Sequence, residues 1–398
     1  MIRYLTAGES HGKALTVIVE GFPSNLKINP EEINKELKRR QGGYGRGTRM
    51  KIETDWAEIL SGIRFGKTLG SPISILINNK DWENWQDVMS VESKSLNFDK
   101  ITIPRPGHAD LVGTLKYNFE DIRNSIERSS ARETAARVAA GSIAKIFLKQ
   151  FGIVIGSVVE NIGGIYPEID LMYEMQEEKS LNEKYFLNLF KASEESQLRV
   201  ADKKQENKII SRIKQVKKKG DTLGGTFITV ALGVPVGLGS FMQADRKINS
   251  EIASAIMSIN AVKGVEIGEG FSGSEKPGSN VHDEIIIKNK TLVRKTNHAG
   301  GIEGGITNGM PILVRSAMKP IATLMSPLQS VDIKTMKKVS SRRERSDFVA
   351  VPSCAVISEH ALAWILAKHM LIKFGGDSIE ETKSNFRNYH KMLEKRFR

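Results

Sequence analysis

Cysteine is almost absent from this sequence, with Cys354 the only one among 398 residues. A single thiol excludes a disulfide framework and a zinc site built from thiolates, and it fits a reducing compartment. The seven histidines include no i, i+4 pair with an intervening glutamate, and no carboxylate spacing matches a calcium loop. We therefore expect a protein that holds no metal.

Long apolar runs are also missing. The most apolar stretch, residues 355–372, contains Glu359 and Lys368, so we interpret it as too polar to span a bilayer. Near the N-terminus, Glu9 stands where a signal peptide needs an apolar segment. These features predict a cytoplasmic protein with no membrane partner.

Acidic residues are outnumbered by basic ones, 46 to 59, which gives a net charge of +13 with neutral histidines. The excess predicts anionic partners, which could be nucleic acid, a membrane surface or small phosphorylated molecules. The chain is 40% hydrophobic and 26% charged, close to the globular average, so disorder and collagen-like structure are excluded. Its length allows one large domain or two to three ordinary ones.

Periodicity and capping signals predict an alternation of strands and helices. Asn29-Pro30-Glu31-Glu32 is a helix start, and the alanine-rich segment after Ser130 predicts a slim helix that lets another backbone approach closely. The expected strands cover 14–20 and 224–233, and the expected helices cover 30–40, 130–151, 207–219, 245–260 and 377–398. Residues 171–219 are rich in Glu and Lys and predict a peripheral excursion.

One internal repeat is visible. Residues 62–73 and 301–312 share glycine, isoleucine and proline at six positions, and each copy precedes a helix with an early acid, Glu133 or Glu359. We infer two related β-then-α halves, with two sheets around a shared helical layer. Chance matching in a chain with 35 glycines is the alternative.

Three familiar motifs match in letters but not in context. Gly8-Glu-Ser-His-Gly12 lacks the upstream sheet that a nucleophile elbow needs. Residues 268–273 fit a dinucleotide fingerprint but run into Pro277, and residues 62–68 are one residue short of a P-loop. We therefore expect none of these three sites.

The interval from Lys38 to Lys51 has six basic residues, no acid and four glycines. A solvated charge run is the plain alternative. The glycines favour an anion site, because they let backbone amides and the guanidiniums of Arg46 and Arg49 close around a ligand. Tyr44 is the only aromatic residue there, whereas nucleic-acid surfaces interleave aromatic and basic residues. A small, highly anionic ligand fits better.

Two further segments combine arginine with a shaped backbone. Arg105 and His108 share a loop that two prolines and a glycine fix, although a rigid turn with a hydrogen-bonded histidine would look the same. Residues 128–132 carry two arginines and two serines at the mouth of the slim helix, where a helix N-terminus suits an anion. Ordinary capping by Ser130 is the alternative there.

The C-terminal third adds a glycine-rich turn at 297–305, a basic loop at 319–323 and a cluster of arginines before Asp347. We expect Asp347 to stay charged among arginines, and we expect Arg342 and Arg343 to form a surface salt-bridge network. Together the segments predict arginine-lined pockets shaped by glycine. The residues alone do not define a reaction.

In this order, the segments resemble the chorismate synthase family from Tyr4 to about Ala367. Residues 171–219 and the tail after Gly376 contribute little. The resemblance rests on seven motifs: Gly8-Glu-Ser-His-Gly12, Gln41-Gly-Gly-Tyr-Gly-Arg-Gly47, Arg105-Pro-Gly-His-Ala-Asp110, Arg128-Ser-Ser-Ala-Arg-Glu-Thr-Ala-Ala-Arg-Val138 with Gly141, Ser258-Ile-Asn-Ala-Val-Lys-Gly264, Asn297-His-Ala-Gly-Gly301 and Arg345-Ser-Asp347.

The resemblance implies an α+β fold, a β-α-β sandwich with a helical layer between two antiparallel sheets, assembled as a homotetramer. Residues 1–376 would form a single catalytic domain and 377–398 a surface helix. The implied reaction removes the 3-phosphate and a C6 hydrogen from 5-enolpyruvylshikimate 3-phosphate and gives chorismate, the last step of the shikimate pathway towards aromatic amino acids. It requires reduced FMN without net redox change, the flavin lending and recovering an electron.

The resemblance also implies roles for individual residues. His11 would protonate the departing phosphate, His108 would stabilise the charge of the flavin, and Asp347 would assist removal of the C6 proton near flavin N5. The substrate would contact Ser10, Arg40, Arg46, Arg49, Arg105, Arg132 and Arg345. The flavin would contact Arg128, Ser129, Ser130, Asn260, Ala261, Gly304, Lys319, Pro320, Ile321, Ala322, Thr323 and Arg345.

Three functions stay open at this point: the phosphate-eliminating lyase, a conventional flavin oxidoreductase and a basic nucleic-acid-binding protein. The sequence also leaves open whether NADPH reduces the flavin on this chain or a separate reductase does so.

Overall fold

A four-stranded antiparallel sheet comes from the N-terminal part of the chain, in the order β1-β2-β6-β3. The structure is a computed structural model that describes residues 2–47, 54–92, 98–288, 291–343 and 347–397. The expected strand at 14–20 is confirmed residue for residue, and its alternation buries Leu15, Val17 and Val19 while Ile18 faces outwards. The strands of this sheet are β1 (Arg3–Ala7), β2 (Ala14–Glu20), β3 (Glu58–Ile59) and β6 (Ile73–Asn78).

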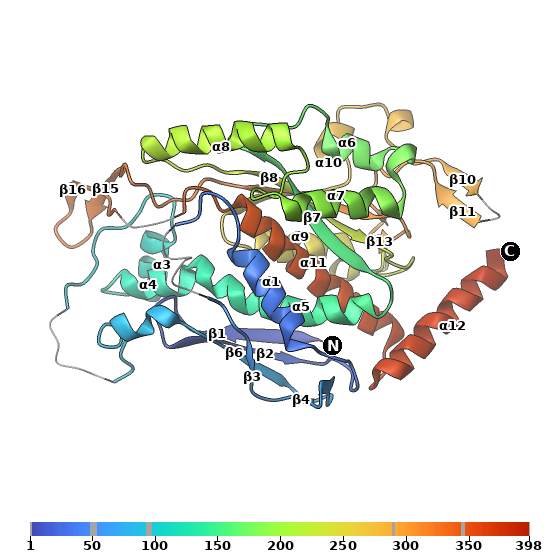
Figure 1. Cartoon of the computed structure of the whole chain (residues 1–398), viewed down its shortest axis with the longest axis horizontal. Helices are drawn as coiled ribbons and strands as arrows, with labels where there is room; N and C mark the ends of the chain where they lie inside the picture. The colour runs from blue at the N-terminus through green and yellow to red at the C-terminus, as the bar shows by residue number, and fades with distance from the viewer. Residues whose placement is uncertain (1, 48–53, 93–97, 289–290, 344–346, 398) are drawn as a thin grey trace.

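A second antiparallel sheet, in the order β7-β8-β14-β9, lies on the other side of a helical layer (Figure 1). The strand expected at 224–233 is confirmed as β8. The strands of this sheet are β7 (Val154–Ile162), β8 (Gly225–Leu232), β9 (Val262–Ile267) and β14 (Ile312–Met318).

Four helices occupy the layer between the sheets. They are α1 (Pro30–Gln41), α5 (Thr134–Lys149), α9 (Ile248–Met257) and α11 (Val351–Phe374). The side chain of Asn29 caps α1 as predicted, accepting a hydrogen bond from the Glu31 amide. Where a helix was expected to open at Ser130, that residue caps a 3₁₀ turn, η2 (Ala131–Glu133), and the helix begins four residues later. The α+β sandwich predicted from the sequence is confirmed.

The centre of the layer is the contact between α5 and α11. A Cβ added to Gly141 would lie 2.4 Å from the Cβ of His360, so the slim helix allows the close approach that its composition predicts. Among the described residues, α11 is the one helix long and apolar enough to cross a membrane by length and composition, and it contains the 355–372 stretch considered above. However, 72% of its most apolar window is buried inside the fold.

The repeated motif forms the same structure in both halves. Each copy makes a two-residue hairpin, β4 (Ile63–Arg64) with β5 (Lys67–Thr68) and β12 (Ile302–Glu303) with β13 (Ile306–Thr307), and leads into a central strand. Gly62 and Gly301 both have positive φ, and a Cβ on either would collide with backbone atoms. The halves share one strand order, which supports the duplication as a proposal. Glu359 is the ninth residue of α11, so it is not an early acid.

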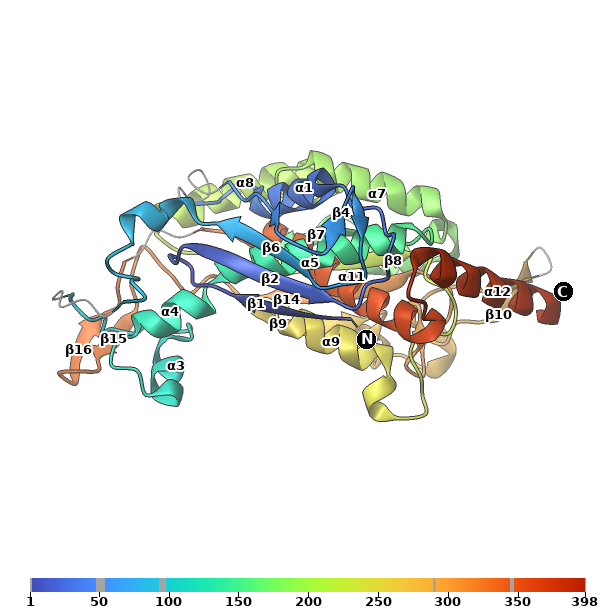
Figure 2. The same ribbon diagram turned by 90° about the horizontal axis from the view of Figure 1, so that it is seen from below.

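The two outer faces of the sandwich differ. The excursion at 171–219 forms α6 (Leu171–Gln176), η3 (Glu178–Ser180), α7 (Glu183–Glu195) and α8 (Lys203–Lys218). Helices α6 and α7 pack onto the outer face of the second sheet, where Phe186 is fully buried. Across the outer face of the first sheet no described helix lies (Figure 2), and Leu5 and Ile18, paired in register, are exposed there.

Helix α8 begins at Lys203, before the predicted residue 207, because the Asp202 side chain accepts hydrogen bonds from two backbone amides and caps it there. The helix expected at 245–260 divides into the 3₁₀ turn η4 (Ala244–Arg246) and α9, with the predicted isoleucines buried. The expected C-terminal helix is α12 (Ile379–Phe397), which projects from the body (Figure 1).

The remaining elements lie at the ends of the sandwich. They are η1 (Lys80–Asn84), α3 (Asp110–Tyr117), α4 (Arg123–Ser129), α10 (Gly270–Gly273), η5 (Gly278–Asn280), β10 (Ile285–Lys288), β11 (Thr291–Arg294), β15 (Gln329–Asp332) and β16 (Lys337–Ser340).

Candidate active site

A buried carboxylate, Asp55, joins two of the predicted substrate arginines. It lies 2.5 Å from Arg40 Nη2 and also accepts from Arg132, whose Nε donates to the side chain of Asn79 at 2.9 Å. Burial alone would raise the pKa of Asp55, but the charges of Arg40 and Arg132 outweigh it and hold the pKa below its usual value. Three segments far apart in the sequence therefore share one charged centre.

Arg46 and Asp347 form a second ion pair beside the first. Arg46 Nη1 lies 3.0 Å from the Asp347 carboxylate, which also accepts from the Gly47 amide at 2.5 Å. Burial lowers the pKa of Arg46; Asp347 opposes that shift and the positive charge of Arg40 reinforces it. The Nε atoms of Arg40 and Arg46 are both buried without a hydrogen-bond partner among the described residues, which suits a site that receives a further anion.

The excursion helps to shape this loop. The Tyr44 amide donates to the Gln197 carbonyl at 2.9 Å, and the methyl group of Ile213 on α8 lies 3.6 Å from the Cβ position of Gly45. Residues 171–219 therefore reach from the periphery to the basic loop, although the sequence predicted only a peripheral excursion.

His11 is held against α4. Its backbone amide donates to Glu127 Oε2 at 2.8 Å, and its Nδ1 lies 2.9 Å from Glu127 Oε1. The imidazole stacks on Trp85 with the ring centroids 4.0 Å apart. The neighbouring Ser10 is buried and its hydroxyl donates to that of Ser130 at 3.0 Å.

The loop with Arg105 and His108 is closed by Asp110. Arg105 contacts this carboxylate through Nε at 2.8 Å and through Nη2 at 3.0 Å, and His108 Nδ1 contacts it as well. Burial would raise the pKa of Asp110, but the hydrogen bonds from His108 and Arg105 hold it well below its usual range. Arg105 Nη1 also donates to the Thr323 hydroxyl at 3.0 Å, so this loop meets the predicted basic loop at 319–323.

The predicted flavin contacts converge from both halves. The Asn260 side chain donates to the Ser129 carbonyl at 3.0 Å, and the Lys319 amide donates to the Ala261 carbonyl at 3.0 Å. Lys319 Nζ donates to the carbonyl of Gly107. Ala261 has a φ of 67°, a left-handed conformation that is uncommon for alanine, so the backbone is held in an unusual shape at this junction.

The rest of the predicted flavin set lies at the same end of the sandwich, with one exception. Arg128 donates to the carbonyls of Thr6 and Gly8, and Ala322 lies 3.6 Å from the Cβ position of Gly107. Pro320 and Ile321 lie between Lys319 and Ala322 in the same loop. Gly304 lies in the hairpin before β14, whereas Lys319 follows β14, so within one chain it is separated from the others by the length of that strand.

Two of the predicted arginines, Arg49 and Arg345, lie outside the described residues. The salt-bridge network expected for Arg342 and Arg343 stays a prediction. Whereas Arg343 is exposed, Arg342 is half-buried. Burial, together with the charge of Arg105, lowers its pKa, which places it next to the site. No pattern in the sequence marked it as different from Arg343.

Four further residues are part of the site although the sequence did not single them out. Asp55, Asn79 and Glu127 each pair with a predicted residue more than a dozen positions away, and no local spacing reveals such partners. Asp110 stood inside a recognised motif, which was a usable signal. The arginines therefore have buried carboxylate partners that hold them in place.

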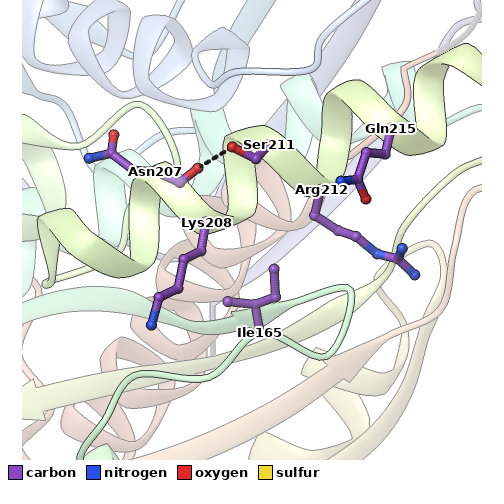
Figure 3. A pocket seen from close by; sticks show the side chains of 6 residues that line it. All are labelled: Ile165, Asn207, Lys208, Ser211, Arg212 and Gln215. Atoms are coloured by element: carbon purple, nitrogen blue, oxygen red, sulfur yellow. Dashed lines mark hydrogen bonds between the residues drawn. The ribbon is translucent and has the colours of Figure 1, made fainter.

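Two hollows in the described surface lie away from this site. A shallow hollow of about 420 Å³ runs along α8, between Lys208, Arg212 and the floor residue Ile165 (Figure 3). A second hollow of about 40 Å³ is lined by Tyr4, Arg137 and His360. Neither contains any of the predicted site residues.

The fold and the site together define an α+β enzyme whose loops gather arginines and histidines for a small, multiply charged anion. The chain matches the family model described as chorismate synthase over residues 2–371. Chorismate synthase from Aquifex aeolicus is 54% identical over 391 residues, covering 98% of this chain and 97% of the relative. Chorismate synthase from Chlorobaculum tepidum is 53% identical over 399 residues, covering both chains completely.

A solved structure described as the crystal structure of chorismate synthase has a TM-score of 0.78 and 46% sequence identity. It covers 98% of this chain, which covers 97% of it in return. The chain belongs to the chorismate synthase family. The resemblance predicted from the motifs is thereby confirmed.

Proposed function

We propose that this chain removes phosphate and the C6 hydrogen from 5-enolpyruvylshikimate 3-phosphate to give chorismate, as a carbon-oxygen lyase that requires reduced FMN. The family match and the relatives support the activity. The observation that supports this proposed site is the gathering of arginines from three separate segments on one end of the sandwich: Arg40 with Arg46, Arg105, and Arg132.

The substrate has two carboxylates and a phosphate, and these arginines match that charge. Two of their Nε donors are buried and have no hydrogen-bond partner in the part of the chain that the structure describes. Guanidiniums suit the planar, bidentate geometry of carboxylate and phosphate oxygens. Ser10, Arg49 and Arg345 complete the proposed substrate contacts. Holding the phosphate between fixed cations stabilises the charge that develops as it leaves.

The proposed flavin contacts suit a ligand such as FMN, which has an anionic phosphate and polar ring atoms. Arg128 and Lys319 supply cations, and Ser129, Ser130 and Thr323 supply hydroxyls. The contacts would come from Arg128, Ser129, Ser130, Asn260, Ala261, Lys319, Pro320, Ile321, Ala322, Thr323 and Arg345, and Gly304 joins them only if another copy supplies it. When bound, reduced FMN supplies an electron that the reaction returns.

Three side chains would then transfer protons or stabilise charge. His11 donates a proton to the departing phosphate, and its Nε2 is the nitrogen left for this, because Nδ1 is engaged by Glu127. His108 is oriented by Asp110 and would stabilise charge beside the flavin. Asp347 is fixed by Arg46 and the Gly47 amide and would assist removal of the C6 proton.

We further propose a cytoplasmic homotetramer. The first sheet presents an outer face with exposed Leu5 and Ile18, and burying such a face against a second copy is a common way to cover it. NADPH is a candidate reductant for the flavin. No finding from the fold or the relatives supports the alternative of a nucleic-acid-binding protein.

An anaerobic assay tests the proposal. Photoreduced FMN and 5-enolpyruvylshikimate 3-phosphate should give chorismate and phosphate with many turnovers per flavin. A conventional flavin oxidoreductase would instead consume one reductant per turnover. Repeating the assay with oxidised FMN and NADPH, in place of light, shows whether the chain reduces its own flavin.

A further inference from the structure

The pairing of Glu127 with His11 goes beyond what a structural contact needs. One carboxylate receives both the backbone amide and the imidazole of the same residue, at 2.8 Å and 2.9 Å. The Ser10 amide also donates to the Glu127 carbonyl at 3.0 Å. Three contacts thus fix the backbone and the ring of this histidine to one point on α4.

The contact also decides the tautomer. A carboxylate only accepts hydrogen bonds, so Nδ1 must carry the hydrogen that faces Glu127. Burial would raise the pKa of Glu127, but the hydrogen bond and the charge of His11 hold it below its usual value. The acid is therefore charged at neutral pH and accepts the Nδ1–H of its partner in a charge-assisted hydrogen bond.

The surroundings hold the ring plane. Trp85 stacks on the imidazole with an interplanar angle of 28°, and the Arg123 guanidinium lies 5.1 Å from the Trp85 ring centroid. The charged groups around the pair are Arg123, which is 3.8 Å from Glu127, and Asp81, which accepts from the Trp85 indole at 3.1 Å. Glu127 is the only one of these in direct contact with His11 among the described residues.

We propose that Glu127 is a positioning residue for the reaction: it orients His11, fixes its Nδ1–H tautomer and sustains the protonated ring that delivers a proton from Nε2 to the leaving phosphate. The same arrangement of a carboxylate behind a histidine supports proton transfer in other enzymes. This inference rests on the proposed role of His11.

Glu127→Gln is the test, assayed anaerobically with photoreduced FMN. The turnover rate should fall about 10²-fold. Removing a residue that orients a metal-ligating histidine lowers activity by roughly 10- to 100-fold, and replacing the aspartate of a catalytic triad lowers kcat by about 10⁴-fold. FMN affinity and KM should change little. Because a general acid must be protonated, a less stable imidazolium should move the basic limb of the kcat/KM profile to lower pH. Glu127→Asp, which keeps the charge, should restore part of the rate and the original profile.

Two controls separate positioning from folding. Glu251→Gln removes a carboxylate 3.3 Å from another histidine, His369, and should leave the basic limb unmoved. The double variant of Glu127→Gln with His11→Ala should be no slower than His11→Ala alone, since residues that act as a unit are not additive. Additive losses, or a Glu127→Gln enzyme with the wild-type rate and profile, would overturn the proposal.

The same experiment distinguishes the two levels of inference. If the wild-type chain forms no chorismate, the proposed function fails. If the wild-type chain is active and His11→Ala is as fast, the role of His11 fails. If only the Glu127 variants behave as wild type, the positioning role alone fails.

Discussion

The connection between β1 and β2 covers residues 8–13 and carries Ser10 and His11, whereas the equivalent connection between β7 and β8 covers residues 163–224 and holds α6 to α8. In the first half a short turn keeps reactive side chains at the end of the sheet and leaves the outer face bare. In the second half the long insertion covers the outer face. Two halves with one strand order thus differ in their loops, and the loops determine what each half contributes.

The ends of the inner helices show the same division. Arg40 lies in the last turn of α1 and Arg46 follows the helix, and we assign both to the substrate. After α9 come Asn260 and Ala261, which we assign to the flavin. The strands β6 and β14 are followed by Asn79 and by Lys319, one on each side of the site. We propose that the first half supplies most of the substrate contacts and the second half most of the flavin contacts. The exceptions are Arg128, Ser129 and Ser130 in the first half and Arg345 and Asp347 in the second.

The largest expected effect belongs to the first half. His11→Ala should lower kcat by roughly 10² to 10⁴, because a general acid contributes that much to a proton transfer. FMN binding, measured by the change in flavin fluorescence, should be retained, since the flavin contacts lie on other segments. A variant that keeps the wild-type rate would remove His11 from the chemistry.

Asp55→Asn should cost about 3–5 kcal/mol of stability at pH 7, because it leaves two buried guanidiniums without their shared carboxylate. The lowered pKa of Asp55 means that its contribution is present above the unfolded-state value near 4 and is lost as the pH falls through the folded-state value. Urea unfolding from pH 7 to pH 2 should therefore show a weaker pH dependence in the variant.

Exposed Asp245→Asn is the control for this measurement and should unfold like the wild type. If Asp55→Asn also unfolds like the wild type, the charged centre between Arg40 and Arg132 does not stabilise the fold.

Phe186→Ala examines the covered face of the second sheet. Phe186 is fully buried between α7 and the sheet, and truncating a buried phenylalanine costs about 3–5 kcal/mol. Thermal unfolding should report this loss, while the oligomeric state measured by light scattering stays the same.

Leu5→Lys tests the bare outer face of the first sheet. It should weaken assembly, measured by light scattering, with little loss of stability. An unchanged assembly in Leu5→Lys would show that the bare face is not the contact between copies.

The finest comparison separates the two halves by ligand. Arg46→Ala should raise KM for the substrate and lower kcat/KM about 10- to 100-fold, as expected for a lost charge-assisted hydrogen bond. Lys319→Ala should instead weaken FMN binding and leave the substrate KM nearly unchanged. Titration of each ligand in both variants checks this. Equal effects on both ligands would contradict the division between halves.

Local signals were sufficient for much of the fold. The alternation at Ala14–Glu20, the cap at Asn29 and the alanine-rich helix around Gly141 each depend on neighbours in sequence, and all three are confirmed. The predicted start of a helix was wrong where a side chain near it has a partner far away in the sequence. Glu133, the early acid expected within its helix, lies in the preceding 3₁₀ turn and contacts Thr6 and Arg137, and the helix begins at Thr134.

The arginines and histidines of the site were visible in the sequence, but the acids that hold them were not. Asp55 and Glu127 lie on segments without a motif of their own, and their partners are known only once the chain is folded. Arg342 and Arg343 are indistinguishable in sequence. In the fold Arg342 differs from an ordinary surface residue because it is half-buried next to Arg105. Electrostatic partnership across long sequence distances is therefore what a single sequence does not reveal.

We propose that loops from both halves form one site in which reduced FMN promotes phosphate loss without being consumed. Phosphate release from 5-enolpyruvylshikimate 3-phosphate, measured anaerobically with the flavin far below the substrate concentration, tests it most directly. The account predicts that phosphate and chorismate rise together to many times the amount of flavin, which stays reduced. Phosphate that stops at one equivalent per flavin, or that forms equally fast without reduced FMN, would contradict it.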